Sequence, residues 1–522
     1  MRRYDIAIVG SGFAGSLLAM IARRFGRSVV LLERGRHPRF AIGESSTPLS
    51  NLLLEELCLK YGLSNITPLT KWGSWQRIYP ELACGLKRGF TFFHQAPGQR
   101  EIATLDRRNQ LLVAASPHNE VADTHWYRAD FDCFLVREAQ EAGVDYLDEC
   151  EISEFKHNDH ESLLGGIRKG QPIEMAARFI VDASGPRGFL HKALRLGERP
   201  LPDLPATQAL YAHFSGVRKL DDLFGREPWQ EAPYPIEDAA VHHVFEGGWA
   251  WVLHFRNGIT SAGAAVIAPL AARLQLSDGV QAWERLLQRL PVLREQLAHA
   301  KAVQPFRHIA QLRFRSEQVT GSNWALLPSS AGFVDPLLST GFPLTLLGVT
   351  RLAKIIEHDW QRQTFAEKLE NYALETDSEL FATSRLIGAL YANMGNFRVF
   401  SALSLVYFAI ASYSEVARRL GKRHLAQSFL LHDHPQFGPK SIRLLERALR
   451  IQTQQESEEL IEEVYRLIEP FDVAGLGQRT RFNWYPVKAE ELLRSGYKLG
   501  ASQEEVMQML ERCGFQPVTS QS

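Results

Sequence analysis

A glycine-rich turn near the N-terminus is the clearest candidate for a binding site in this chain. Gly10, Gly12 and Gly15 follow the apolar run at residues 4–9 and fit the pattern G-x-G-x-x-G. In this motif the glycines permit a tight turn, close approach of the backbone to a pyrophosphate and close packing of helix on strand. The free N–H groups of the helix can then bind phosphate oxygens. Glu33 ends the next apolar run, where a carboxylate can accept hydrogen bonds from ribose hydroxyls. The pattern predicts a dinucleotide-binding site.

A second segment has the features of an anion-binding helix start. Pro343 suits the first turn of a helix, so Thr340 and Gly341 stand at its expected N-terminus. The positive end of the helix dipole and the free N–H groups there favour an anion. The anion could be a halide ion or the negative charge of a reduced cofactor ring.

Lys87 stands just before a strand-like apolar run at residues 89–93, where its side chain could be buried. Burial would lower the pKa of its amine and keep part of it in the neutral, nucleophilic form. The alternative is an ordinary surface lysine in a loop beside Arg88. The sequence alone leaves both interpretations open.

The composition excludes some classes of function. Lys and Arg together number 59, as do Asp and Glu, so the formal net charge is zero and gives no support for nucleic-acid binding. The five cysteines are scattered without a C-x-x-C pair, which indicates reduced thiols in a cytoplasmic setting and no structural metal. The N-terminus enters a strand pattern directly, so we expect no signal peptide. The apolar run at 399–413 is only about 15 residues long, which favours a buried helix over a membrane span.

The elements that must position these residues change in type along the chain. Residues 1–60 read as a β-α-β unit followed by a loop and a helix. A helical pattern covers 127–143, and a buried strand ends in a turn of small residues at 182–185. Residues 200–300 alternate like an antiparallel sheet, with a hairpin signal at 256–258. After about residue 344 the pattern is mostly helical.

Several motifs occur in an order that resembles a known fold. The glycine turn, Arg128, the segment Asp-Ala-Ser-Gly at 182–185 and Gly-Phe-Val-Asp-Pro at 332–336 resemble the FAD-binding fold of aromatic hydroxylases, geranylgeranyl reductases and flavin-dependent halogenases. Lys87, the pair Trp249 and Trp251, and the segment at 335–341 make the flavin-dependent halogenases the most similar family. The resemblance covers roughly residues 1–360.

The resemblance implies a role for each matching residue. FAD, acting as FADH2, would contact residues of the turns and loops around the expected sheet, namely Gly10, Gly12, Phe13, Ala14, Gly15, Glu33, Arg34, Glu44, Ser45, Arg128, Asp182, Gly185, Asp335 and Gly341. Thr340 and Gly341 would bind halide. Lys87 would receive hypohalous acid, either as a covalent chloramine or through a hydrogen bond. For Arg128, an ion pair with Asp130 or Asp132 at the helix start remains an alternative.

Trp249 and Trp251 would stand on the substrate side of the flavin. The halogenase signature is Trp-x-Trp-x-Ile-Pro, whereas this chain has Leu253-His254 at the last two positions. A pair of aromatic residues on one face of a core strand is the alternative, because residues i and i+2 point the same way. Adjacent His242 and His243 point to opposite faces, which excludes a metal pair and leaves one able to face the substrate pocket.

Two further departures concern the substrate and the cofactor. Tryptophan halogenases carry a glutamate where this chain has Leu338, so phenol and pyrrole halogenases are the nearer comparison. Related flavoproteins hold the ribityl chain with an aspartate where this chain has Ser329. A neutral hydroxyl makes a weaker hydrogen bond than a carboxylate, so we hypothesise that FAD is held loosely and exchanges with a reductase.

The predicted fold is α/β, with a Rossmann-like FAD-binding domain, an inserted antiparallel β-sheet substrate domain and a helical C-terminal region. The FAD-binding domain is discontinuous, at 1–75, 121–200 and 301–360. The substrate domain comprises 76–120 and 201–300, and the helical region 361–522.

The expected function is an FADH2-dependent halogenase that uses O2 and chloride or bromide on an electron-rich aromatic substrate. Its expected partners are a separate NAD(P)H:flavin reductase and a small substrate, free or tethered to a carrier protein. Two alternatives stay open: an FAD-dependent monooxygenase or geranylgeranyl-reductase-type enzyme that does not halogenate, and a catalytically silent FAD-binding protein.

Overall fold

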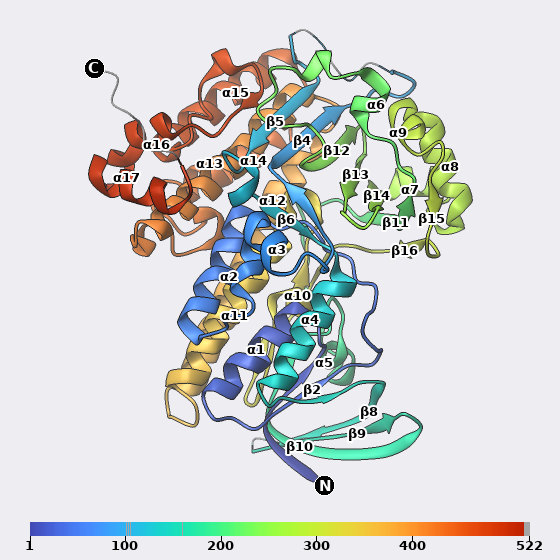
Figure 1. The fold of residues 1–522 in the computed structure, drawn as a ribbon, viewed down its shortest axis with the longest axis vertical. Helices are drawn as coiled ribbons and strands as arrows, with labels where there is room; N and C mark the ends of the chain where they lie inside the picture. The colour runs from blue at the N-terminus through green and yellow to red at the C-terminus, as the bar shows by residue number, and fades with distance from the viewer. Residues whose placement is uncertain (101, 103, 105, 159, 516–522) are drawn as a thin grey trace.

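The structure is a computed structural model that describes residues 1–100, 102, 104, 106–158 and 160–515. Two large sheets and a helical C-terminal region make up the molecule (Figure 1). The first sheet has the strand order β18-β19-β10-β1-β2-β7, with β8 and β9 attached through β10. Its strands are β1 (Arg2–Val9), β2 (Val29–Leu32), β7 (Asp145–Leu147), β8 (Cys150–His157), β9 (Ser162–Arg168), β10 (Gln171–Asp182), β18 (Thr320–Gly321) and β19 (Trp324–Leu326).

The core of the first sheet is parallel, as a Rossmann-like fold requires. β1 pairs in parallel with both β10 and β2, and β10 pairs in parallel with β19. Four helices pack beside this sheet and on each other (Figure 1). They are α1 (Phe13–Arg24), α2 (Pro48–Tyr61), α4 (Arg128–Glu141) and α11 (Gly341–His358). The parallel strands bring the turns that follow them to one edge, where a nucleotide binds in such folds.

The second sheet has the order β15-β11-β14-β13-β12-β4-β5-β21, with β16 attached to β11. Its central hairpin turns at residues 255–258, as the sequence predicts. The strands are β4 (Gly89–His94), β5 (Gln110–Ala114), β11 (Thr207–Ser215), β12 (Ala240–Phe245), β13 (Gly248–His254), β14 (Ile259–Ile267), β15 (Lys301–Ala302), β16 (Arg307–Ile309) and β21 (Trp484–Tyr485). A separate antiparallel pair joins β3 (Cys84–Lys87) to β6 (Asp123–Trp126).

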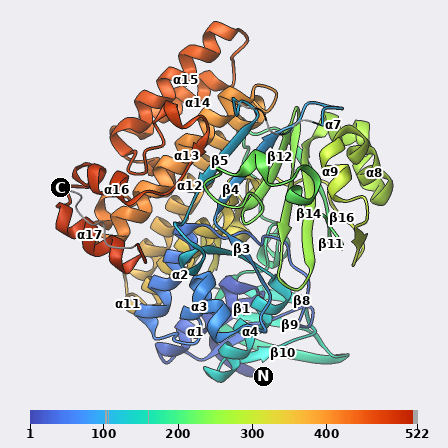
Figure 2. The same cartoon turned by 45° about the horizontal axis from the view of Figure 1, so that its top comes forward.

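The prediction of an antiparallel sheet for 200–300 omits several helices. These are α6 (Leu220–Phe224), α7 (Ala268–Leu274), α8 (Val280–Arg289) and α9 (Pro291–Gln296). In Figure 2, α7–α9 and the C-terminal helices lie on opposite sides of the second sheet. β15 and β16 pair with β11, so residues 301–309 belong to the second sheet, although the predicted boundary assigns them to the cofactor domain.

The C-terminal region is helical and is joined to the rest of the molecule by a shared core. Its main helices are α12 (Phe365–Ala392), α13 (Phe397–Arg419), α14 (Gly438–Ala448), α15 (Gln454–Ile468), α16 (Ala489–Ser495) and α17 (Gln503–Arg512). Local signals start several of them: Thr453 and Glu456 form a capping box on α15, and Ser502 and Glu505 form one on α17. One hydrophobic cluster runs from α1 and β1 to α12 and α13.

Helix α13 contains the apolar run seen in the sequence. It is the one helix among the described residues that is long and apolar enough to cross a membrane, and 78% of its most apolar 18-residue window is buried inside the protein. Its aromatic side chains pack on the second sheet: the ring of Phe400 lies 5.8 Å from that of Phe92, and Phe408 lies 5.1 Å from Phe90. The helix therefore has the environment of a core helix.

Candidate active site

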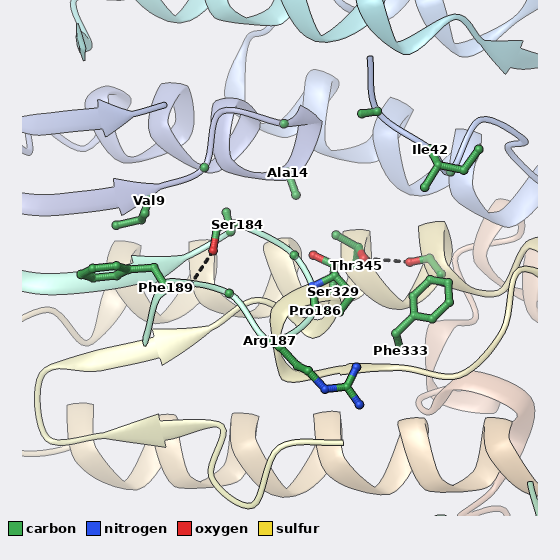
Figure 3. A pocket seen from close by; sticks show the side chains of 18 of the residues that line it. Val9, Ala14, Ile42, Ser184, Pro186, Arg187, Phe189, Ser329, Phe333 and Thr345 are labelled. Carbon is green, nitrogen blue, oxygen red and sulfur yellow. Dashed lines mark hydrogen bonds between the residues drawn. The ribbon is translucent and has the colours of Figure 1, made fainter. Parts of the chain in front are cut away.

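A cavity of about 1300 Å³ opens at the edge of the first sheet where its parallel strands end. The turns after β1, β2 and β10, together with the start of α11, supply most of its wall (Figure 3). Predicted cofactor residues that line it are Gly10, Gly12, Phe13, Ala14, Glu33, Arg34, Arg128, Gly185, Asp335 and Gly341. Figure 3 also shows Ser329 and Phe333 among the residues that line this cavity, together with Pro186 and Arg187 from the turn after β10.

The turn after β1 needs glycine for steric reasons. Gly10 has φ +107°, and a Cβ there would lie 2.5 Å from the carbonyl oxygen of Ala183. A Cβ on Gly15 would lie 2.1 Å from the carbonyl oxygen of Gly10, so Gly15 serves helix packing and does not line the cavity. No side chain caps α1 at Gly12. Its first N–H groups are therefore available to a phosphate ligand.

Glu33 is held as an ionised acceptor beside the turn. The hydroxyl of Ser11 donates to Glu33 Oε2 at 2.8 Å, and the backbone N–H of Gly35 donates to Oε1 at 2.9 Å. Burial alone would raise the pKa of Glu33, but Arg39, whose Nη2 lies 3.0 Å from Oε2, and these hydrogen bonds lower it overall. A carboxylate so placed suits the ribose hydroxyls of a dinucleotide.

Arg128 both lines the cavity and makes an ion pair, so the two predictions for it are compatible. Its Nε and Nη2 each donate to the carboxylate of Asp132 at 2.8 Å. Its Nη1 donates to the carbonyl oxygens of Ile42 and Gly43, at 3.2 and 2.9 Å. The guanidinium thereby fixes residues 42 and 43, which begin the segment 42–46, against the cofactor cavity.

Three other residues predicted to contact FAD lie outside the wall of the cavity. Asp182 shapes the turn after β10, because its carboxylate accepts the N–H groups of Ser184 and Leu190. Glu44 is buried and its Oε1 lies 2.7 Å from Nε2 of His213. Ser45 accepts a hydrogen bond from Lys87. The loop lies where the resemblance implies, but these side chains face other parts of the protein.

Thr340 and Gly341 stand at the start of α11, as predicted. No side chain caps the helix and no acidic residue occupies its first turn. A Cβ added to Gly341 would meet no heavy atom within 4 Å, so there is open space beside this residue, which also lines the cavity. The preceding Leu338 and Ser339 adopt left-handed conformations, with φ +62° and +55°. This helix start can therefore accept an anion.

The cavity reaches the tryptophan pair through Asp335. Trp249 Nε1 donates to Asp335 Oδ1 at 3.2 Å, and the hydroxyl of Tyr391 donates to Oδ2 at 2.9 Å. Burial raises the pKa of Asp335 to about 6. The rings of Trp249 and Trp251 lie 5.5 Å apart, and Trp251 Nε1 donates to Ser261. No sequence motif indicated Tyr391, which comes from α12.

Lys87 is fully buried, which excludes a surface loop lysine. Its Nζ donates to Ser45 Oγ at 2.8 Å and to the carbonyl oxygen of Ser46, and it lies 3.8 Å from the centroid of the Phe90 ring. Burial lowers the pKa of the amine. The segment 42–46 therefore contacts the cofactor cavity at one end and the Lys87 amine at the other.

Aromatic rings make a second connection between the cofactor cavity and Lys87. The ring of His242 lies 5.2 Å from Trp249, 5.9 Å from Phe90 and 4.5 Å from Phe92. His242 Nδ1 lies 2.8 Å from the carbonyl oxygen of Ala240, and burial lowers the pKa of the imidazole to about 3. The imidazole is therefore neutral within a continuous apolar row from Trp249 to Phe90.

The fold and the cavity together define the class as a dinucleotide-binding protein with a Rossmann-like domain. A model described as an NAD(P)-binding Rossmann-like domain matches residues 8–82. A model described as tryptophan halogenase matches residues 108–394, more than half of the chain. The chain therefore belongs to the tryptophan halogenase family of flavin-dependent halogenases, which confirms the predicted family, fold class and cofactor.

Individual relatives agree with this assignment. Monodechloroaminopyrrolnitrin halogenase PrnC of Pseudomonas fluorescens is 28% identical over 416 residues, covering 76% of this chain and 70% of PrnC. Tetracycline 7-halogenase of Kitasatospora aureofaciens is 28% identical over 422 residues, covering 78% of this chain and 74% of that protein. The crystal structure of halogenase PltM with phloroglucinol and FAD has a TM-score of 0.78 at 22% identity, covering 92% of this chain and 99% of PltM.

Proposed function

We propose that this chain is an FADH2-dependent halogenase that places chloride or bromide on an electron-rich phenol or pyrrole. The carrying observation is the buried Lys87 amine, hydrogen-bonded to the same segment, 42–46, that borders the cofactor cavity. Three relatives support this substrate class: PrnC, tetracycline 7-halogenase and the 1H-pyrrole-2-carbonyl-[peptidyl-carrier protein] brominase of Pseudoalteromonas luteoviolacea, which is 25% identical to this chain.

The residues present fit FAD. The glycine turn and the uncapped start of α1 would hold the pyrophosphate, Glu33 the ribose, and Arg128 the adjoining loop. When bound, reduced FAD would activate O2, which is the oxidant that converts a halide ion to hypohalous acid. Ser329 lies at the cavity where related flavoproteins have aspartate, which supports loose binding and exchange with a separate flavin reductase.

The chain's own residues then divide the remaining work. The N–H groups at Thr340 and Gly341 bind the halide ion. The buried Trp249 and Trp251 rings keep bulk water and the organic substrate away from the cofactor cavity. Lys87 receives the halogen as a chloramine or through a hydrogen bond, and holds it near the aromatic substrate. The amine is fully buried, and this exclusion of bulk water limits hydrolysis of the reactive species.

The departure from the Trp-x-Trp-x-Ile-Pro signature changes little on the face of β13 that carries the two tryptophans. His254 occupies the face of β13 opposite to Trp249 and Trp251, because its position differs from theirs by an odd number of residues. Its Nε2 lies 3.2 Å from Glu237 Oε1, and its Nδ1 lies 3.0 Å from Thr260 Oγ1. The substitution therefore leaves the tryptophan face unchanged except for Leu253, which supports halogenation over hydroxylation.

The decisive assay combines the protein with FAD, a flavin reductase, NADH, bromide and a panel of phenols, pyrroles and indoles. We expect brominated product by mass spectrometry, lost at least 100-fold in Lys87→Met. The matched control is Lys60→Met, which removes a half-exposed lysine that pairs with Glu357 on the surface. Hydroxylated product without bromination, or full bromination by Lys87→Met, would contradict the proposal. Free and carrier-bound substrates are compared in the same assay.

A further inference from the structure

The buried Lys87 amine has a charged neighbour that no motif identifies. Lys87 lies directly opposite Asp123 in the antiparallel pair of β3 and β6. Directly opposed residues place their Cβ atoms about 5 Å apart on one face of a sheet. Lys87 is 0% exposed and Asp123 is 5% exposed, so both side chains share one part of the interior. The two charges therefore interact with little screening by water.

The Asp123 carboxylate is only half satisfied by hydrogen bonds. Asn51 from α2 donates to Oδ1 at 2.7 Å. Oδ2 is buried and, within the part of the chain that the structure describes, has no hydrogen-bond partner. A buried acceptor without a partner is unfavourable and needs an explanation. Asn51 thus fixes the orientation of the carboxylate, while Oδ2 remains free of hydrogen bonds within the described residues and can interact electrostatically with Lys87.

The other titratable groups beside the pair are neutral. Burial and the charge of Lys87 lower the pKa of His125, on β6, and of His242, on β12. Burial and the charge of Asp123 raise the pKa of Tyr407, on α13. None of these three side chains therefore supplies a counter-charge to Lys87 or Asp123 near neutral pH.

The remaining charges nearby are paired with each other. Arg419 on α13 donates from Nε to Glu415 Oε1 at 2.8 Å. Both act on Asp123, Glu415 raising and Arg419 lowering its pKa, so their effects oppose each other. The principal counter-charge of Lys87 is thus Asp123: burial lowers the pKa of Lys87 and Asp123 opposes this, while burial raises the pKa of Asp123 and Lys87 opposes that.

We propose that Asp123 is a positioning residue for Lys87, and that its carboxylate, held by Asn51, sets whether the buried amine carries a proton. The pair has two states of equal net charge, ammonium with carboxylate and amine with carboxylic acid. The inference rests on the proposed function of Lys87 for its catalytic meaning, but this linked titration is a property of the protein alone.

The protonation state decides what Lys87 can do. A neutral amine can attack the halogen of hypohalous acid: the N–halogen bond forms, the O–halogen bond breaks, and the departing hydroxide takes the amine proton to give water. An ammonium group has no lone pair and can only donate a hydrogen bond to hypohalous acid. An ionised Asp123 stabilises the ammonium form, whereas a protonated Asp123 favours the neutral amine.

The test measures the titration of Lys87 directly in FAD-loaded protein labelled with [ε-¹³C]lysine. The Lys87 signal is the one missing from Lys87→Met. In Asp123→Asn, which keeps the size and an oxygen for Asn51, the amine loses its counter-charge, so its midpoint should fall by about 1 pH unit or more. Asp472→Asn is the control, because Asp472 is a buried carboxylate that accepts N–H groups of its own loop.

A second variant covers the case in which Asp123→Asn fails to fold. Asn51→Ala removes one hydrogen bond to the carboxylate, which makes Asp123 easier to protonate and should lower the Lys87 midpoint in the same direction by a smaller amount. An unchanged or raised midpoint in the folded variants would overturn the proposal. The pH dependence of bromination should shift to lower pH with the midpoint, and absence of bromination alongside a shifted midpoint would refute only the proposed function.

Discussion

The cofactor cavity and the surroundings of Lys87 differ in almost every physical respect. The cavity is large and its wall carries many charges, including Arg34, Arg39 and Arg307. Lys87 is completely enclosed by hydrogen-bond acceptors and aromatic rings. A cofactor that exchanges with a reductase needs an accessible, charged cavity, whereas a reactive halogen must be kept from water. The segment 42–46 and a row of aromatic rings connect the two regions, so each region can meet its own need.

The largest effect on one region alone is expected from Gly10→Ala. Its φ of +107° and a Cβ 2.5 Å from the carbonyl oxygen of Ala183 would force the turn after β1 to move. We expect FAD affinity to fall about 100-fold by fluorescence titration, with the titration of Lys87 unchanged. Gly26→Ala is the matched control, because Gly26 also has positive φ, +75°, but open space around it. Equal losses in both variants would show that backbone strain, not the clash, is responsible.

Asp335 lies on the boundary between the regions and should make stability depend on pH. Burial raises its pKa to about 6, so the folded chain binds this proton more tightly than the unfolded chain. Its contribution to stability is therefore full below the unfolded pKa and is lost as the pH rises to about 6. The shift corresponds to about 3 kcal/mol.

The free energy of unfolding should fall less between pH 4 and 7 in Asp335→Asn than in the wild type. Urea unfolding of FAD-free protein measures this difference. A pH slope identical to that of the wild type would show that the carboxyl group does not titrate in this range.

Trp249 should contribute more than Trp251 to the connection between the cofactor cavity and Lys87. Trp249→Phe removes hydrogen bonds to Asp335 and Tyr391, whereas Trp251→Phe removes one to Ser261. We expect bromination to fall about tenfold in Trp249→Phe and less in Trp251→Phe, since one or two hydrogen bonds contribute about 1–2 kcal/mol. Product is measured under single-turnover conditions. A larger effect of Trp251→Phe would place the boundary of the cavity at Trp251.

The smallest effect is expected at Ser329. A carboxylate in Ser329→Asp would accept stronger hydrogen bonds from a ribityl chain, so FAD affinity should rise by a few-fold. Ser329→Ala should lower it slightly. Equilibrium dialysis measures both. Weaker binding by Ser329→Asp would contradict the hypothesis that the missing aspartate loosens FAD.

The sequence predicted the cofactor cavity better than the Lys87 site for a physical reason. Gly10, Gly12 and Glu33 act within one β-α-β unit, so their spacing carries the geometry. The contacts of Lys87 come from separate parts of the chain: β6 supplies Asp123 and α2 supplies Asn51. Strands as short as β3 and β6 leave no clear pattern.

Two other differences have the same origin. The loop with Glu44 and Ser45 was expected at the cofactor, and the loop is there, but tertiary contacts turn these side chains to His213 and Lys87. Tyr391 joins the site because α12 packs against α11 and brings the tyrosine hydroxyl to Asp335. Local patterns thus predict backbone turns well, and they cannot report which distant helix completes a site.

The short strand β21 covers an edge of the second sheet that could otherwise pair with another copy of this chain. It pairs in parallel with β5 at the end of the second sheet, and Trp484 Nε1 donates to Gln110 Oε1 at 3.1 Å. Without residues 484–485, β5 would present a row of unpaired N–H and C=O groups, which is a template for strands of other chains. The C-terminal region thus covers the edge of the second sheet. A chain that ends before β21 should therefore self-associate through β5.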